Sequence, residues 1–405
     1  MNTKIRLIVM NFLQYGVWGS WLISLGTYLG GTLHFSDLQI GGFYATMGVA
    51  SLFMPAIMGI IADRWLPAQK VLGLCHIIGA IFMILAVGQT EYNGLYPLIL
   101  LSVMFYMPTI ALSNSVAYNA LSKSNLDVVK DFPPIRAFGT VGFIVSMWTV
   151  DLLGFRPTPY QFYLSAGLGL LLGIYAFTLP NCAINKKVST KNWIEALGLR
   201  AFSLFKQKKM AIFFIFSMLL GMSLQITNGF ADSYIASFGN NPDFADTFGV
   251  KHPTILISLS QVSEALCILL IPFFLRKFGI KVVMLISMLA WVLRFGLLGT
   301  GDPGAGVWMF ILSMLVYGVA FDFFNISGSL FVDKETDPAI RSSAQGVFML
   351  MTNGFGAFIG SYLAGMVVGR YSWPTSWFIF AGFSLVVAIT FAFIFKYKHE
   401  QEDRI

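Results

Sequence analysis

Long apolar runs alternate with short polar breaks along the whole chain. Each run has about 20 residues or more, which is the length that an α-helix needs to cross the hydrocarbon core of a bilayer. A helix satisfies its own backbone hydrogen bonds in that environment, so the runs predict membrane-spanning helices. The twelve predicted spans are residues 7–31, 38–62, 71–90, 95–119, 133–153, 160–180, 210–236, 252–275, 282–300, 305–331, 343–369 and 373–395.

The basic residues support this count of spans. When the loops are assigned alternately to the two sides of the membrane, 21 of the 26 Lys and Arg residues fall on one side. Three fall on the other side, and Arg136 and Arg294 lie inside spans. Because Lys and Arg accumulate in cytoplasmic loops, we expect both termini to be cytoplasmic.

The composition excludes an ordinary soluble enzyme. Hydrophobic residues make up 57% of the chain and charged residues 11%, whereas a soluble domain has about 25% charged residues. The net charge of +7 is spread over short spacers, so it indicates topology and predicts no nucleic-acid partner. No cysteine or histidine pattern indicates a metal, and His76 is interpreted as a packed histidine. No catalytic or phosphate-binding motif appears, so we expect neither a cofactor nor enzyme activity.

One long polar connection divides the spans into six and six. The predicted domains are an N-terminal six-helix bundle at 1–180, a cytoplasmic linker at 181–209, a C-terminal six-helix bundle at 210–397 and a cytoplasmic tail at 398–405. Trp193 and Leu197 in the linker are compatible with an amphipathic helix on the membrane surface. A solvated linker is the alternative.

A short motif follows the second span. Gly59, Asp63 and Arg64 match the Gly-x-x-x-Asp-Arg pattern of the major facilitator superfamily, which the twelve spans and paired halves also resemble. The resemblance implies an all-α membrane protein of two pseudo-symmetric bundles, with a gate-latching role for Asp63 and Arg64. Trp65 and Leu66 replace the residues that usually follow, and basic loop chemistry is the alternative explanation for the motif.

Charged side chains inside spans are the first candidates for function. A charge at the centre of the bilayer costs at least about 2.5 to 3.5 kcal/mol, so it normally faces a cavity and marks a pathway. The candidates are Arg136, Glu264, Arg294 and Asp322.

Arg136, Thr140 and Phe143 share one face of the fifth span, because their spacing is i, i+4 and i+7. Gly139 and Gly142 lie on an adjacent face and would let a neighbouring helix approach closely. If the helix begins at the two prolines before Arg136, this side chain lies near the cytoplasmic surface. If the helix begins earlier, Arg136 lies deeper beside a cavity, and we favour that interpretation.

Polar pairs recur in the seventh and eighth spans. Gln225 and Asn228 are spaced i, i+3, and Gln261 and Glu264 repeat that spacing. Together these groups offer hydrogen-bond donors and acceptors for an uncharged ligand with many hydroxyl and amide groups. Hydrogen bonding between helices is the alternative role for the amides.

The tenth span carries an aromatic pair beside a polar strip. Tyr317 and Phe321 share one face, and Asp322 and Asn325 share the next. Such a pair can stack on a flat ring while the polar strip holds the edge of the ring. Asp322 and Glu264 are competing candidates to carry a proton, and the sequence does not choose between them.

Five motifs together resemble the nucleoside:proton symporter family over nearly the whole chain. They are Asn11–Leu22, Asp131–Thr140, Gln225–Asn228, Ala320–Gly328 and Arg341–Gly346. The resemblance implies a symporter that imports nucleosides with protons across the bacterial cytoplasmic membrane by alternating access. The expected partners are nucleosides, protons and the lipid bilayer, and the expected state is a monomer.

The resemblance also implies roles for individual residues. The nucleoside-contacting positions are Arg136, Thr140, Phe143, Gln225, Asn228, Gln261, Glu264, Tyr317 and Phe321. Asp322 is implied in proton coupling. Helical spacing selects the same side chains, so we expect them to converge on one pocket between the two halves. A sugar or glycoside symporter of the same fold is the alternative function, and a membrane-embedded enzyme or receptor is a third class.

Overall fold

The computed structural model describes residues 2–182, 199–337 and 340–397, which form helices and contain no strand. Helical elements lie at each of the predicted apolar runs. The chain divides into two compact units, unit 1 (Met1–Leu197) and unit 2 (Gly198–Ile405). The predicted amphipathic segment around Trp193 and the tail at 398–405 lie outside the described residues.

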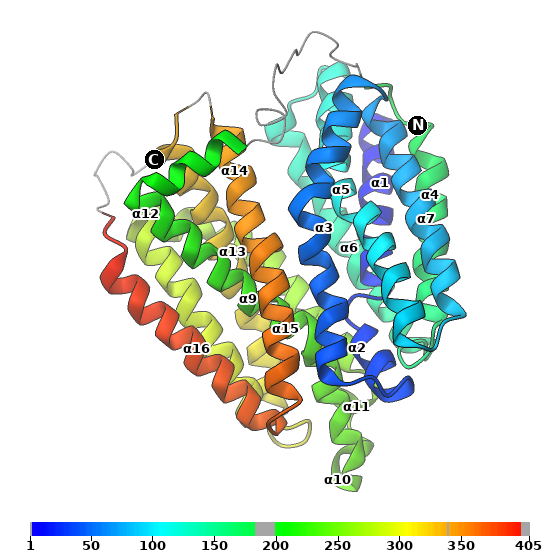
Figure 1. The fold of residues 1–405 in the computed structure, drawn as a ribbon, viewed down its shortest axis with the longest axis vertical. Coiled ribbons are helices and arrows are strands. Elements are labelled where there is room, and N and C mark those ends of the chain that lie inside the picture. The colour runs from blue at the N-terminus through cyan, green and yellow to red at the C-terminus, as the bar shows by residue number, and fades with distance from the viewer. Residues whose placement is uncertain (1, 183–198, 338–339, 398–405) are drawn as a thin grey trace. The chain divides into compact units, whose positions relative to one another are not determined.

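Unit 1 is built from six long helices and two short elements (Figure 1). They are α1 (Thr3–Gly19), α2 (Leu25–Thr27), the π-helical turn η1 (Tyr28–Thr32), α3 (Asp37–Arg64), α4 (Ala68–Val87), α5 (Tyr92–Lys123), α6 (Val128–Leu152) and α7 (Tyr160–Ala176). α1 packs against α6 and α7, and α4 packs against α5 and α7. Apolar residues from these helices, including Leu7, Leu72, Val116 and Leu172, form one buried core.

The first predicted span is not one continuous helix, which corrects the expectation for residues 7–31. α1 ends at Gly19, and a turn over residues 20–24 separates it from α2. A break inside the apolar run needs partners for polar groups. Ser20 Oγ donates to the Val17 carbonyl oxygen at 2.8 Å, and Ser24 Oγ donates to Gln161 Oε1 at 2.9 Å. These serines supply hydrogen bonds where the apolar pattern predicts a plain helix.

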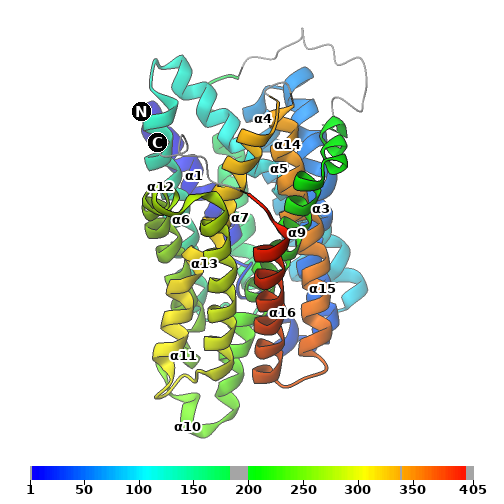
Figure 2. The same cartoon turned by 90° about the vertical axis from the view of Figure 1, so that its left-hand side faces the viewer.

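Unit 2 contains more irregular segments than unit 1. Its elements are η2 (Leu199–Lys206), α9 (Lys208–Ser237), η3 (Phe238–Asn240), α10 (Pro242–Ala245), α11 (Phe248–Lys251), α12 (Pro253–Thr300), α13 (Val307–Glu335), α14 (Arg341–Met349), the π-helical η4 (Leu350–Gly356), α15 (Ala357–Val368) and α16 (Trp373–Ile394). α12 covers two predicted spans and is broken at Gly279, whose φ is 75°. Glycine adopts this conformation without steric cost, so α12 consists of two helical arms. α13 runs beside α12 (Figure 2).

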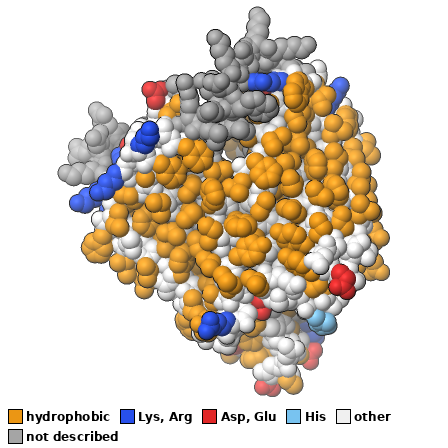
Figure 3. All heavy atoms as spheres, in the orientation of Figure 1, with side chains coloured by type: hydrophobic (Ala, Val, Ile, Leu, Met, Phe, Trp, Pro, Cys, Tyr) orange, Lys and Arg blue, Asp and Glu red, His pale blue; other side chains and the backbone are white. Residues whose placement is uncertain are grey.

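The outer surface carries large apolar side chains. Leu269 is 75% exposed, Phe393 77% and Ile174 65%. Hydrophobic side chains cover most of the face in Figure 3, while charged side chains on that face gather toward its upper and lower ends. Among the described residues, nine helices are long and apolar enough to cross a membrane. Soluble proteins rarely expose such continuous apolar area, so the surface fits a lipid environment.

Candidate functional site

In unit 1 the guanidinium group of Arg136 lies over the ring of Tyr15. Arg136 Cζ is 3.8 Å from the ring centroid, within the range of a cation–π interaction. Gly139 makes room for the ring, because a Cβ at this position would lie 2.5 Å from Tyr15 Cδ2. α6 begins at Val128, ahead of the two prolines, as the favoured interpretation of the sequence requires. Helical spacing did not select Tyr15, although it lies within the Asn11–Leu22 motif.

Glycines bring α1 and α6 into backbone contact. A Cβ at Gly142 would overlap the carbonyl oxygen of Phe12, and a Cβ at Gly19 would overlap that of Phe143. The prediction that the glycines of the fifth span admit a neighbouring helix is therefore confirmed, and the neighbour is α1. Phe143 is buried and Thr140 is partly buried on the same helix.

A hydrogen-bond network in unit 1 centres on the buried side chain of Gln14. His76 Nε2 lies 2.7 Å from Gln14 Oε1, and Gln14 Nε2 donates to Thr109 Oγ1 at 2.7 Å. The Tyr106 hydroxyl donates to the Gln14 carbonyl oxygen at 2.9 Å. His76 is thus a packed histidine, as predicted. The network connects α1, α4 and α5, and it supports the segment that carries Tyr15.

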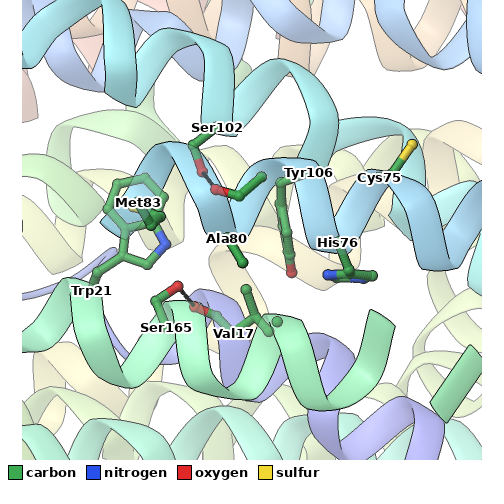
Figure 4. A pocket seen from close by; sticks show the side chains of 11 residues that line it. Val17, Trp21, Cys75, His76, Ala80, Met83, Ser102, Tyr106 and Ser165 are labelled. Carbon is green, nitrogen blue, oxygen red and sulfur yellow. Dashed lines mark hydrogen bonds between the residues drawn. The ribbon is translucent and has the colours of Figure 1, made fainter. Parts of the chain in front are cut away.

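A small cavity of about 20 Å³ lies beside this network. Figure 4 shows His76 and Tyr106 among its lining side chains, with hydroxyl groups of Ser102 and Ser165 bonded to backbone carbonyl oxygens. Sites for small organic ligands have volumes of roughly 300 to 1,000 Å³, whereas a single water needs only about 10 to 15 Å³. The cavity therefore belongs to helix packing and is too small for a nucleoside.

In unit 2 two carboxylates lie on helices that pack against each other. Glu264 on α12 interacts electrostatically with Asp322 on α13. Asp322 is 3% exposed, and its Oδ2 has no hydrogen-bond partner among the described residues. Gly318 permits this approach, because a Cβ there would lie 2.5 Å from the carbonyl oxygen of Ser263. The structure thus brings together the two candidate proton carriers.

The predicted aromatic pair is stacked. The ring centroids of Tyr317 and Phe321 are 5.8 Å apart with an interplanar angle of 13°. Arg294, which is 2% exposed, places its Cζ 4.9 Å from the Tyr317 ring centroid. Arg294 Nη1 donates to the Ser313 carbonyl oxygen at 2.5 Å. The sequence left open what Arg294 faces, and the structure places it against Tyr317, where it fixes the position of the aromatic pair.

The predicted amides lie on α9 and α12. Gln225 is buried, and its Oε1 has no hydrogen-bond partner in the described part of the chain. Asn228 on α9 and Gln261 on α12 are partly buried. A Cβ at Gly221 would overlap the carbonyl oxygen of Thr352 in η4, so α9 is packed tightly against this π-helical turn. The amide of Gln225 therefore sits on a firmly held helix and keeps an acceptor available.

The predicted gating motif lies at the C-terminal end of α3. Asp63 is exposed and Arg64 is partly buried. No atom lies within 4 Å of the position that a Cβ would take at Gly59, so packing does not require glycine there. The latching role of Asp63 and Arg64 remains a prediction.

The cysteines are buried and carry no disulfide. Cys75, Cys182 and Cys267 are free thiols. Burial raises the pKa of Cys182, which lies after α7, so its thiol is poorly reactive at neutral pH. Over the described ranges, no group of three His, Cys, Asp or Glu side chains is placed to hold a metal ion.

Sequence comparison gives a family and several relatives. The family model described as "Nucleoside H+ symporter" matches residues 1–400. The xanthosine permease of Escherichia coli (strain K12) is 52% identical over 409 residues, which cover 99% of this chain and 98% of that protein. The nucleoside permease NupG of Escherichia coli (strain K12) is 50% identical over 406 residues, with 98% and 97% coverage.

Solved structures share the fold. The crystal structure of the nucleoside transporter NupG matches with a TM-score of 0.92 at 50% identity, covering 98% of this chain and 100% of that chain. A POT family transporter in complex with 5-aminolevulinic acid matches with a TM-score of 0.77 at 14% identity, covering 97% and 96%. At 14% identity, the second match shows similarity of the fold alone. The described part of the chain is therefore helical, with a major-facilitator-like fold.

Proposed function

The chain belongs to the nucleoside H+ symporter family, and we propose that it imports nucleosides with protons across the bacterial cytoplasmic membrane by alternating access. It is a multi-pass membrane protein of a transporter family. The observation that carries the coupling is the contact region of α12 and α13, where Glu264 and Asp322 interact beside the Tyr317–Phe321 stack.

The proposed topology has twelve spans in two pseudo-symmetric six-helix bundles, at 1–180 and 210–397. Nine described helices are long and apolar enough to cross a membrane, and α12 is one of them. Since α12 breaks into two arms at Gly279, it supplies two spans, and α1 and α7, with 17 residues each, supply the remaining two. The distribution of Lys and Arg supports cytoplasmic termini, with 181–209 as a cytoplasmic linker. We propose that the protein acts as a monomer.

The nucleoside site is proposed to use side chains from both units. Arg136, Thr140 and Phe143 contribute from unit 1, and Gln225, Asn228, Gln261, Glu264, Tyr317 and Phe321 contribute from unit 2. Tyr317 and Phe321 already form a parallel aromatic surface on which a base can stack. The Gln225 amide oxygen is available to accept a hydrogen bond. The guanidinium group of Arg136 supplies donors for base or ribose oxygens.

Proton coupling is assigned to the carboxylate pair. Two carboxylates close together in a medium of low dielectric repel each other unless one of them binds a proton. Binding of a proton to Glu264 or Asp322 relieves this repulsion, and nucleoside contact with Glu264 links the proton to the substrate. Asp63 and Arg64, at the end of α3, are proposed to latch the gate. Gly59 belongs to the same motif.

Uptake of radiolabelled uridine and adenosine by cells that produce the protein tests the function. A protonophore is expected to abolish accumulation above the external concentration, while exchange of labelled for unlabelled nucleoside continues. Excess unlabelled nucleoside is expected to compete, and free ribose or a disaccharide is not. Accumulation that persists with the protonophore would rule out proton coupling, and competition by sugars would favour a sugar or glycoside symporter.

A further inference from the structure

α5 carries a polar groove that none of the predicted site residues lines. The groove has a volume of about 500 Å³. Its lining residues are Ala111, Asn114, Ser115, Tyr118, Asn119 and Ser122. Their spacing places them on one face of α5, and five of the six carry a hydroxyl or amide group. The volume lies within the range of about 300 to 1,000 Å³ that small organic ligands occupy.

Two amides in this groove hold unused acceptors. Asn114 Oδ1 and Asn119 Oδ1 are buried atoms without a hydrogen-bond partner among the described residues. Other polar side chains of α5 are bonded, since Ser102 Oγ donates to the Gly79 carbonyl oxygen and Ser113 Oγ to that of Ile110. A buried acceptor without a donor costs about 1 to 3 kcal/mol. Both residues line the groove, so rotation of either side chain would turn its unused acceptor toward a ligand.

The groove adjoins the helix face that carries Arg136. Tyr118 contacts Phe132 of α6 edge to face, with ring centroids 4.6 Å apart and an interplanar angle of 75°. Phe132 lies four residues before Arg136, on the same side of α6. The groove thus extends along α5 from the α6 face that carries Arg136 toward Lys123, at the end of α5.

We propose that this groove is a ribose subsite on the surface of unit 1 along which the nucleoside moves. The inference rests on the proposed function. Ribose hydroxyls both donate and accept hydrogen bonds, as do the amide and hydroxyl groups of Asn114, Asn119 and the neighbouring serines. Under the proposed topology, Lys123 lies at the cytoplasmic end of α5, so the subsite holds the ribose as the nucleoside leaves toward the cytoplasm.

Equilibrium binding to the purified full-length protein tests the subsite. Asn114→Ala and Asn119→Ala are compared with Ser113→Ala, which removes a hydroxyl from the same helix but on its buried side. The two ligands are uridine and 2′,3′-dideoxyuridine, which lacks the two secondary hydroxyls. We expect each asparagine variant to weaken uridine binding about 2- to 12-fold, the equivalent of one hydrogen bond. Binding of the dideoxy analogue should change less than about 2-fold, and Ser113→Ala should bind both ligands like the wild type.

The possible results separate this inference from the proposed function. Equal weakening for both ligands would overturn the assignment to ribose, and unchanged binding of uridine by both asparagine variants would overturn the subsite. Failure of the wild type to bind uridine would instead refute the proposed function. Thermal unfolding and gel filtration check each variant for folding, and Asn114→Ser and Asn119→Ser replace any alanine variant that aggregates.

Discussion

Units 1 and 2 each place an arginine over a tyrosine ring, but they surround the pair with different groups. In unit 1 the partly buried Arg136 lies 3.8 Å from the Tyr15 ring centroid. In unit 2 Arg294 is 4.9 Å from that of Tyr317, is 2% exposed and is bonded to a backbone carbonyl oxygen. An arginine over a tyrosine ring can therefore present a cation to a ligand in unit 1 and hold the aromatic pair in position in unit 2.

The two units also differ in their acidic groups. Glu264 and Asp322 both interact electrostatically with Tyr317 in unit 2, whereas the polar network of unit 1 is built around the neutral side chain of Gln14. Under the proposed function, unit 1 recognises the ligand with groups that do not titrate, and unit 2 exchanges protons.

The largest effect is expected from Asp322→Asn. One proton moved down a membrane potential of 100 mV supplies about 2.3 kcal/mol, which corresponds to an accumulation of about 50-fold at 1.36 kcal/mol per factor of ten. If Asp322 carries the coupled proton, the variant loses this accumulation but still exchanges labelled for unlabelled uridine. Glu264→Gln is expected to lose accumulation and to bind uridine more weakly.

Glu335→Gln is the matched control, because Glu335 lies at the end of the same helix in an ion pair with Lys209 at 2.6 Å. It should accumulate uridine like the wild type. Normal, pH-responsive accumulation in both Asp322→Asn and Glu264→Gln would remove the role of the carboxylate pair.

Alanine at the tight glycine contacts should destabilise both units alike. A methyl group at Gly142 or Gly221 would overlap a backbone carbonyl oxygen of the facing helical segment, whereas Gly382 has no atom within 4 Å of its Cβ position. Overpacking of this kind costs about 1 to 3 kcal/mol. We expect Gly142→Ala and Gly221→Ala to lower the thermal unfolding temperature of the purified protein, with Gly382→Ala as the control. Equal temperatures for all three would mean that the two helix pairs are not closely packed.

Substitution of Tyr15 separates a cation–π contact from simple packing. A cation–π interaction contributes about 0.5 to 2 kcal/mol, so Tyr15→Leu should weaken uridine binding about 2- to 30-fold by releasing Arg136. Tyr15→Phe retains an aromatic ring and should bind uridine nearly as the wild type does. Titration calorimetry measures both affinities, and equal affinities of Tyr15→Leu and wild type would show that the ring does not position Arg136.

The smallest effect is expected at the ion pairs near the helix ends. Lys4 binds Asp131 at 2.7 Å in unit 1, and the lysine side chain is 41% exposed. Exposed pairs contribute about 0 to 1 kcal/mol, and salt screens them. Asp131→Asn should therefore lower the thermal unfolding temperature only slightly, and the difference should shrink at high salt. A larger loss, independent of salt, would indicate that Asp131 has another role.

The sequence predicted the helical elements well because the length of an apolar run is a local property. The polar candidates on α6, α12 and α13 were also accessible, since a charge inside a span is conspicuous. The role of Tyr15 and the contact of Arg294 with Tyr317 could not be predicted from the sequence, because they depend on which helices pack together. The break over residues 20–24 could not be predicted either, because it also depends on tertiary contacts. Gln161, far along the chain, accepts the hydrogen bond from Ser24.

Proton movement that accompanies nucleoside entry tests the division between the units most directly. Protein is reconstituted into vesicles containing a pH-sensitive dye, and uridine is added outside without any other gradient. The wild type and Tyr15→Phe should acidify the interior, while the double variant Glu264→Gln, Asp322→Asn should not. If the double variant imports uridine and acidifies the vesicles as fast as the wild type, protons are not coupled through unit 2 at these carboxylates.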